Sequence, residues 1–424
     1  MPDTTSADAL TTSQGRPSMR ALFAVLGFRR YFLASAFSTF AIWITRFLLG
    51  WMAWALTESA FWVGVVSALF LAPTFLLSLL FGVVADRVHP LRGMWITTGA
   101  QAVIGLVATG ASVLGVLQLP LLCLIAACIG IVTAAHHPLR MALLPLLVAR
   151  QHFTGAIGLA SIVFNTSRIL GPALGALLLW LGSPAWAFGV ASGLYCATLA
   201  ALLRVPVVAP ERTVATPHLW RELAAGLGVV RQSPTIRIIL LLTMINGLFG
   251  RTLIEMLPAI SGQLLQGDAG TLAMLTSVAG AGSIMGGLII SRQRGTPSRL
   301  AHLVLLSVLL GAAVMLPVWW IHTGYVLATQ VFVLALSMTI IGTGCQTTLQ
   351  LMVDDAFRGR VMSIWTVISM GMPAAGALLL GALADSFGLP VVITVFALLV
   401  LLIALTLRAP QQRLFAETKP HEET

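Results

Sequence analysis

Long hydrophobic stretches with almost no charged residues recur along the chain, and they constrain its fold more than any other feature of the sequence. Each is close to the roughly 20 residues that a helix needs to cross about 30 Å of hydrocarbon. Only 9% of the 424 residues are charged, whereas about a quarter are charged in a typical soluble domain. The sequence therefore predicts an all-α membrane protein.

Twelve of these stretches are expected to form transmembrane helices, with short connections that make neighbouring helices antiparallel. Their expected limits are 32–56, 61–84, 94–117, 121–145, 154–180, 185–203, 236–260, 270–290, 300–320, 325–349, 361–384 and 389–407. The expected domains are a cytoplasmic N-terminal tail (1–28), a six-helix half (29–204), a cytoplasmic linker with an amphipathic helix (205–235), a second six-helix half (236–408) and a cytoplasmic C-terminal tail (409–424).

The basic residues predict the orientation of the chain in the bilayer. Of the 24 Lys and Arg residues, four arginines lie inside hydrophobic segments and all the others fall in the tails and in alternate loops. Because basic residues near helix ends stay in the cytoplasm, both termini are predicted to be cytoplasmic, in a bacterial inner membrane. The net charge of +10 is then an orientation signal, and it does not predict nucleic-acid binding.

An internal repeat relates the two halves. Adding 205 to the residue number carries Arg46 onto Arg251, Gly82 onto Gly287 and Arg87 onto Arg292. An even number of helices precedes the linker, so the second half enters the membrane in the same orientation as the first. Two parallel six-helix repeats with a site between them indicate alternating access by rocking of the halves.

The loop after the second hydrophobic stretch reads Gly82-Val-Val-Ala-Asp86-Arg87, with Arg92 following. It resembles the signature loop of the major facilitator superfamily. In that resemblance the glycine permits close helix approach, and the aspartate faces the positive N-terminal end of a helix from the other half. We expect a gate formed by Gly82, Asp86, Arg87 and Arg92, with Arg140 nearby; an ordinary solvated loop is the alternative.

The second-half copy of this loop has Ser291 in place of the aspartate, so only the first-half gate is expected to be charged.

The fifth hydrophobic stretch carries small residues three and four apart, which places them on one helical face. Gly158, Gly171, Pro172 and Gly175 resemble the antiporter signature of the same superfamily, although Ser167 and Ala176 replace two of its glycines. Close helix packing and a role in export remain equal alternatives for this stripe.

The wider chain resembles one branch of the superfamily over residues 29–407. Segments such as Arg46-Phe-Leu-Leu-Gly50-Trp51 and Asn165-Thr-Ser-Arg168 are similar to the branch of enterobactin-type siderophore exporters and macrolide efflux proteins. The resemblance implies a major facilitator fold and transport of a small molecule.

Arginines inside hydrophobic segments are costly in a bilayer, so they usually line a cavity or pair with an acid. Arg46 and Arg251 are predicted to face each other across a central cavity that Arg168 also lines. Other residues assigned to this substrate cavity are Asn165, Thr39 and Gly50. Three arginines against one buried acid favour an anionic substrate.

Glu255 is the acid that lies clearly within a hydrophobic stretch, so it is the candidate proton carrier. It follows Arg251 in a series of residues four apart, Thr243, Gly247, Arg251 and Glu255. A structural Arg251–Glu255 pair, one turn apart, is the alternative to a coupling role.

The predicted function is export of a small amphipathic anion, such as a siderophore-like metabolite, or of an antibiotic, by proton antiport. A proton-coupled importer and a membrane sensor without flux are the alternatives. The sequence shows no catalytic constellation of an enzyme and predicts no cofactor or metal site. The expected partners are the substrate, protons and the lipid bilayer, with the chain acting as a monomer.

Overall fold

The computed structural model describes Phe23 and residues 25–148, 152–206, 228–293, 297–321, 323–353 and 355–417. Most of the predicted linker, at 207–227, lies outside the described residues, as do most of the N-terminal tail and the end of the C-terminal tail. The first-half helices are α2 (Leu26–Thr57), α3 (Ala60–Leu76), α4 (Ser78–Arg87), α5 (Pro90–Val113), α6 (Leu119–Leu147), α7 (Phe153–Leu181) and α8 (Pro184–Leu202).

The second-half helices follow the same pattern with more interruptions. They are α10 (Pro234–Ile245), the π-helix η3 (Asn246–Arg251), α11 (Thr252–Glu255), α12 (Leu257–Leu265), α13 (Ala269–Ser291), α14 (Pro297–Ala313), the 3-10 helix η4 (Leu316–Trp320), α15 (Gly324–Met352), α16 (Asp355–Phe387) and α17 (Leu389–Glu417).

These helices account for the twelve predicted membrane crossings. In the described part of the chain, eleven helical segments are long and apolar enough to span a bilayer, and α3 is a shorter apolar helix of 17 residues. The second crossing is broken at Leu77, one turn after Pro73, and continues as α4.

Polar side chains define where several helices begin. Ser59 accepts a hydrogen bond from Trp62 N at the start of α3, and Asp268 accepts one from Thr271 N at the start of α13. Proline occupies the first turn of α5, α8 and α10, where its missing N–H costs nothing.

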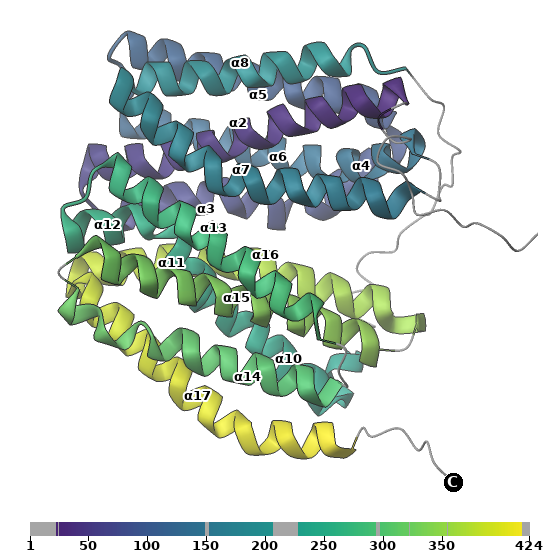
Figure 1. The fold of residues 1–424 in the computed structure, drawn as a ribbon, viewed down its shortest axis with the longest axis vertical. Helices are drawn as coiled ribbons and strands as arrows, with labels where there is room; N and C mark the ends of the chain where they lie inside the picture. Colours follow the sequence, from purple (N-terminus) through teal and green to yellow (C-terminus); the bar gives the residue numbers. More distant parts are fainter. Residues whose placement is uncertain are drawn as a thin grey trace, which may run out of the picture.

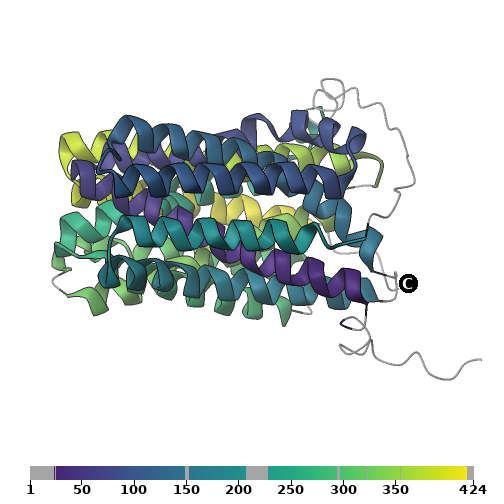
Figure 2. The same cartoon turned by 90° about the horizontal axis from the view of Figure 1, so that it is seen from above.

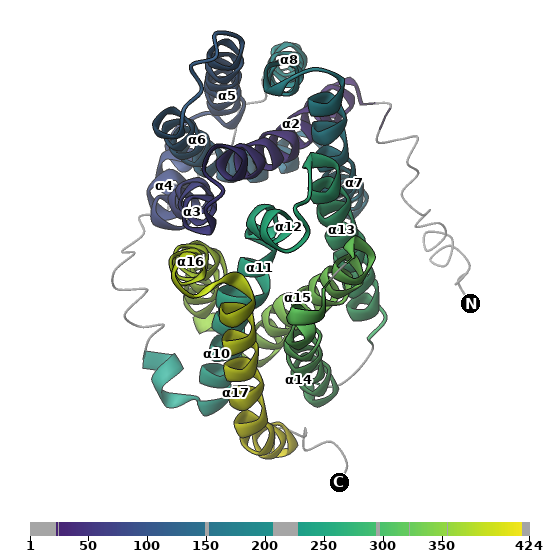
Figure 3. The same cartoon turned by 90° about the vertical axis from the view of Figure 1, so that its left-hand side faces the viewer.

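The helices run side by side in two groups, one formed by α2–α8 and the other by α10–α17 (Figure 1). The described chain begins with α2 and ends with α17 at the same end of the bundle, which we call the tail end; the opposite end is the loop end. Viewed from above, the helices extend along a common direction (Figure 2). From the loop end, α12 lies centrally between α2, α3, α16 and α13 (Figure 3).

Contacts between the two groups are made chiefly by α3 with α16 and by α7 with α13. Small residues allow the closest approach at the loop end. A Cβ atom on Gly64 would lie 2.2 Å from the carbonyl oxygen of Ala377, and one on Gly381 would lie 2.6 Å from that of Ala60. At the tail end of the same helices, Cβ atoms on glycines would meet nothing within 4 Å, as at Gly82, Gly158, Gly287 and Gly359. The two groups are thus closely packed at the loop end, whereas these tail-end glycines do not contact the opposite group.

Candidate functional site

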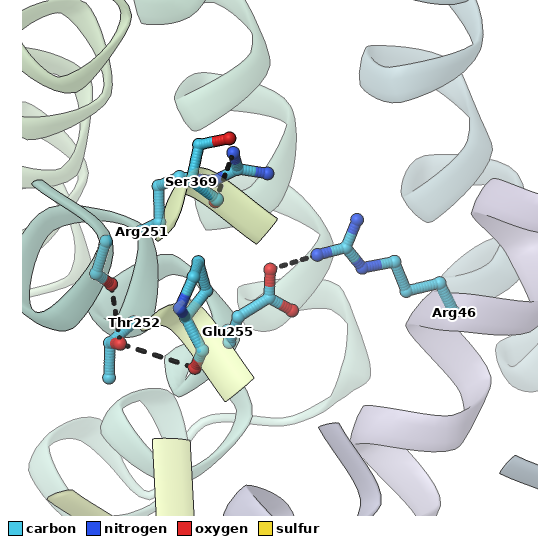
Figure 4. A network of polar contacts seen from close by, with 7 residues as sticks. Arg46, Arg251, Thr252, Glu255 and Ser369 are labelled. Carbon is cyan, nitrogen blue, oxygen red and sulfur yellow. Dashed lines mark hydrogen bonds and ion pairs between the residues drawn. The ribbon is translucent and has the colours of Figure 1, made fainter. Parts of the chain in front are cut away.

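The two groups of helices are joined midway along the bundle by an ion pair. Arg46, on α2, donates from Nη2 to Oε1 of Glu255, at the end of α11 (Figure 4). The side chains are 27% and 10% exposed, respectively, so both are largely withdrawn from solvent. Charges at this depth are stabilised mainly by each other, and the pair therefore ties the first helix of one half to the first helix of the other.

Aromatic rings surround the Arg46 guanidinium. Its central carbon lies 5.2 Å from the ring centre of Trp43 and 5.6 Å from that of Phe70. Cation–π attraction at these distances stabilises the positive charge when the local environment is dry. The sequence analysis identified neither ring, because Phe70 comes from α3 and aromatic residues are common in lipid-facing positions.

The π-helix η3 changes which neighbours the following residues face. Gly247 packs on Met372 of α16, where an added Cβ would lie 2.6 Å from Cβ, and Arg251 donates from Nη1 to the Ser369 carbonyl at 3.2 Å. Glu255 instead faces α2 (Figure 4). Gly247 and Arg251 thus share the face that packs on α16, whereas the side chain of Glu255, after the π-helix, reaches across to the other half.

Among the described residues, Glu255 forms its ion pair with Arg46 and not with Arg251. The structure thus does not show the alternative of a structural Arg251–Glu255 pair. Arg46 and Arg251 lie close enough for their charges to interact. Their side chains take different partners, a carboxylate for Arg46 and the Ser369 carbonyl for Arg251.

Arg168 forms the third part of this cluster. It lies on α7 and donates from Nη2 to Asn165 Oδ1 at 3.2 Å and to the Gly280 carbonyl of α13 at 3.4 Å. Its Nε is buried without a hydrogen-bond partner within the described part of the chain. Both observed partners are neutral, so Arg168 carries a positive charge that no carboxylate in contact with it offsets.

Thr39 and Gly50 lie on the same helix as Arg46 but in packed surroundings. Thr39 is 3% exposed and donates its hydroxyl to the Ser35 carbonyl at 2.6 Å. A Cβ on Gly50 would lie 2.9 Å from Cγ of Pro258, on α12. Gly50 thus supports the close contact of the two halves on the loop-end side of Arg46.

The antiporter-like residues of α7 divide into two environments. A Cβ on Gly171 would lie 2.6 Å from Trp43 Cβ, and one on Gly175 would lie 2.7 Å from Phe47 Cδ1. With the buried Pro172 between them, they pack α7 closely against α2. Gly158, near the tail end, has open space instead. Three members of the motif therefore have a packing role in this conformation.

The expected gate residues gather at the tail end. Gly82 and Arg87 lie on α4, and the exposed Arg92 lies near the start of α5. Asp86 lies on α4 too, but its side chain is outside the described residues. Arg140, on α6, lies beside Tyr31 of α2, within the first half.

Another functional candidate emerges only from the structure. Asp385, near the end of α16, accepts hydrogen bonds from the first residues of α3 at the loop end. The sequence placed it merely at an outer helix end, and no local pattern links it to a segment more than 300 residues away. No group of three possible metal ligands occurs among the described residues.

Comparison with known proteins identifies the family of the chain. A family model described as transmembrane secretion effector, in the major facilitator superfamily, matches residues 18–421. The staphyloferrin A transporter of Staphylococcus aureus is 25% identical over 367 residues, which cover 85% of this chain and 90% of that protein. An enterobactin exporter of Escherichia coli is 27% identical, covering 66% of this chain and 67% of that protein.

Macrolide efflux protein A of Streptococcus pyogenes is 25% identical, covering 78% of this chain and 83% of that protein. Among solved structures, a bacterial homologue of the human lysosomal transporter Spinster superimposes with a TM-score of 0.74 at 14% identity, covering 94% of this chain and 99% of that one. The predicted fold and superfamily are thus confirmed: the chain belongs to the transmembrane secretion effector family of the major facilitator superfamily, and it is a multi-pass membrane transporter.

Proposed function

We propose that the chain exports a small amphipathic anion across a bacterial inner membrane by proton antiport. The observation that carries the proposal is the Arg46–Glu255 pair, which joins the two groups of helices beside two further arginines. In this proposal the halves 29–204 and 236–408 rock about the site, as parallel six-helix repeats do in alternating access. The chain acts as a monomer, because each half supplies one member of the pair.

The positions of the basic residues predict which side of the membrane each end faces. They favour a cytoplasmic location for both termini, so the open tail end would face the cytoplasm and would receive the substrate there. Export also agrees with two relatives, one named as an exporter and the other as an efflux protein.

The charge of the site supports an anionic substrate. Arg46 is paired with Glu255, whereas the observed contacts of Arg168 and Arg251 are to uncharged oxygens. A carboxylate or catecholate would satisfy these two arginines, and an organic cation would add to the unbalanced charge. Siderophore-type anions are therefore better candidates than cationic antibiotics.

Glu255 is the proposed proton site. A proton taken from the outer side neutralises its carboxylate, and the empty transporter returns with this proton to the tail-end-open conformation. Loss of the proton to the cytoplasm forms the Arg46–Glu255 pair while Arg168 and Arg251 hold the next anion, and the pair separates again when the loaded transporter opens at the loop end.

A symporter that imports its substrate is the second candidate, and one physical point favours it. An anion that displaces Glu255 from Arg46 leaves the carboxylate without its counter-charge and so favours its protonation. Anion and proton would then bind together and move in the same direction. The experiment below separates the two directions.

Uptake into inverted membrane vesicles tests the proposal, with labelled enterobactin, staphyloferrin A and a macrolide as separate probes. Antiport predicts that an acidic lumen drives uptake of an anionic probe, and that Glu255→Gln reduces this uptake to the level of vesicles lacking the protein. Glu58→Gln, which alters an exposed acid outside the site, is the matched control and should retain uptake.

Two results would contradict the proposal. Equal uptake by Glu255→Gln and the wild type would remove Glu255 from coupling. An acidic lumen that instead drives preloaded probe out of the vesicles would establish symport.

A further inference from the structure

One carboxylate at the loop end binds the start of a helix in the opposite half. Asp385 Oδ1 accepts a hydrogen bond from Ala60 N at 2.8 Å, and Oδ2 accepts one from Phe61 N at 3.3 Å. The Ser59 hydroxyl also donates to Oδ2. We call this set, Asp385 with Ser59, Ala60 and Phe61, the loop-end latch.

The chemistry of a helix start explains why this contact is favourable. The first N–H groups of α3 have no partners within the helix, and its N-terminus carries a partial positive charge. Ser59 satisfies one of these donors, Trp62 N at 3.3 Å, from within the same half. Asp385 satisfies two more from the other half, with charge-assisted hydrogen bonds that are stronger than neutral ones.

The packing around the latch shows that it exists only while the loop end is closed. The backbones of α3 and α16 are in contact one turn away, where an added Cβ on Gly64 would lie 2.2 Å from the Ala377 carbonyl oxygen. Any separation of the halves at this end therefore withdraws Asp385 from the α3 donors and returns those N–H groups and the carboxylate to solvent.

The same two crossings have the complementary arrangement at the tail end. There α4 ends at Arg87, next to the Asp86 of the expected gate, and α16 begins at Asp355. Added Cβ atoms on Gly82 of α4 and Gly359 of α16 would meet nothing within 4 Å, and α4 and α16 make few or no contacts with each other. Each crossing thus has an aspartate in its last turn, Asp86 in α4 and Asp385 in α16. The α3–α4 crossing ends at the tail end, where α16 begins, and α16 ends at the loop end, where α3 begins.

From this geometry we propose that Asp385 is a gating residue that holds the loop end closed. The loop-end latch and the Asp86 gate act on the same pair of crossings and engage alternately, because closing one end of the pair separates the other. This inference rests on the alternating access of the proposed function.

Distances between spin labels test the latch in the full-length protein, in lipid nanodiscs and without any substrate probe. The four native cysteines are first replaced by alanine. Labels then go on exposed positions, with Leu114→Cys and Tyr325→Cys reporting on the loop end and Met141→Cys and Leu351→Cys on the tail end.

Asp385→Asn keeps the size of the side chain and removes its charge. It should raise the ratio of loop-end-open to loop-end-closed molecules about tenfold, since charge-assisted hydrogen bonds are lost. The tail-end pair should show a matching gain of short distances. Ser59→Ala, which removes one of the three contacts, should produce a smaller shift in the same direction.

Asp268→Asn is the matched control, because Asp268 caps α13 within its own half at the same end of the bundle. Its distance distributions should equal those of the wild type. Unchanged distributions in Asp385→Asn, or an equal shift in Asp268→Asn, would overturn the latch. The latch test does not depend on uptake of the probes by the wild type in inverted vesicles. If the wild type took up no probe there, that result would count against the proposed function and not against the latch.

Discussion

The two ends of the α3–α4 and α16 crossings differ in how closely they approach. At the loop end, glycines bring the backbones together and Asp385 binds the α3 N-terminus. At the tail end, the glycines of the same crossings have open space around them. Small residues in a membrane protein usually indicate permanent close packing. Here the glycines toward the loop end are packed and those at the tail end are not, which is expected when one sequence must form two alternative contacts.

The difference also gives the ion pair a position in the mechanism. Arg46 lies one turn on the tail-end side of Gly50, which packs against Pro258 of α12. The Arg46–Glu255 pair therefore lies next to the closed loop end. Farther toward the tail end, Gly371 of α16 still packs on Phe75 of α3, whereas Gly82 and Gly359 have open space around them. A substrate that enters from the tail end would meet the arginine cluster first.

Among the predicted effects, removing one member of this pair should change the stability of the protein most. Either Arg46→Gln or Glu255→Gln leaves a charge with no partner at low exposure, which should lower the free energy of unfolding by about 3 kcal/mol. The double variant should lose less than the sum of the two, because neither charge is left alone. Unfolding in mixed detergent micelles measures all three.

Glu58→Gln is the control for this prediction, as an exposed acid at the loop end. Strictly additive losses in the double variant would mean that the two charges are solvated separately and that the pair does not join the halves.

Glycine substitutions test the contrast between the ends directly. Gly64→Ala places a Cβ against the Ala377 carbonyl oxygen, so closing the loop end should become about 2 kcal/mol less favourable. Gly82→Ala has open space and should change the stability of this conformation by less than about 0.5 kcal/mol. The ratio of loop-end-open to loop-end-closed molecules, measured with the Leu114 and Tyr325 labels, checks both.

Gly82→Ala should still slow transport, since the alternative conformation brings that glycine toward the other half. If both variants leave the distance distributions and the transport rate unchanged, the two ends do not alternate.

Much of this picture could be predicted from the sequence. The length of the hydrophobic stretches gave the number of crossings, and the rare charges within them indicated Arg46, Arg168, Arg251 and Glu255. The pairing was different: spacing by four favoured Arg251 as the ion-pair partner of Glu255, whereas Glu255 forms its ion pair with Arg46. Which charges meet across the two halves depends on tertiary packing and leaves no pattern in a single sequence.

Asp385 shows a second limit of sequence analysis. In the sequence, an acid near a helix end cannot be distinguished from an ordinary surface residue. The partners of Asp385 on α3 are also more than 300 residues away in the chain. The repeat offset of 205 does not identify Asp385 either. The offset relates equivalent positions in the two halves, whereas the latch joins the end of one crossing to the start of another.

The smallest expected effect concerns the other capping carboxylate of the loop end. Hydrogen bonds from Thr271, first from its backbone N–H and then from its hydroxyl, hold the pKa of Asp268 below its usual value. A carboxyl with a lowered pKa in the folded state stabilises the protein above about pH 4, and this contribution disappears as the pH falls through the lowered value.

Asp268→Asn should remove that pH dependence of the unfolding midpoint while leaving the ratio of the two conformations unchanged, because both partners belong to α13. Asp385→Asn should do the reverse and change the ratio at neutral pH. If Asp268→Asn also shifted the ratio, capping at the loop end would influence gating through helix stability in general, and the contact between the halves would have no special role.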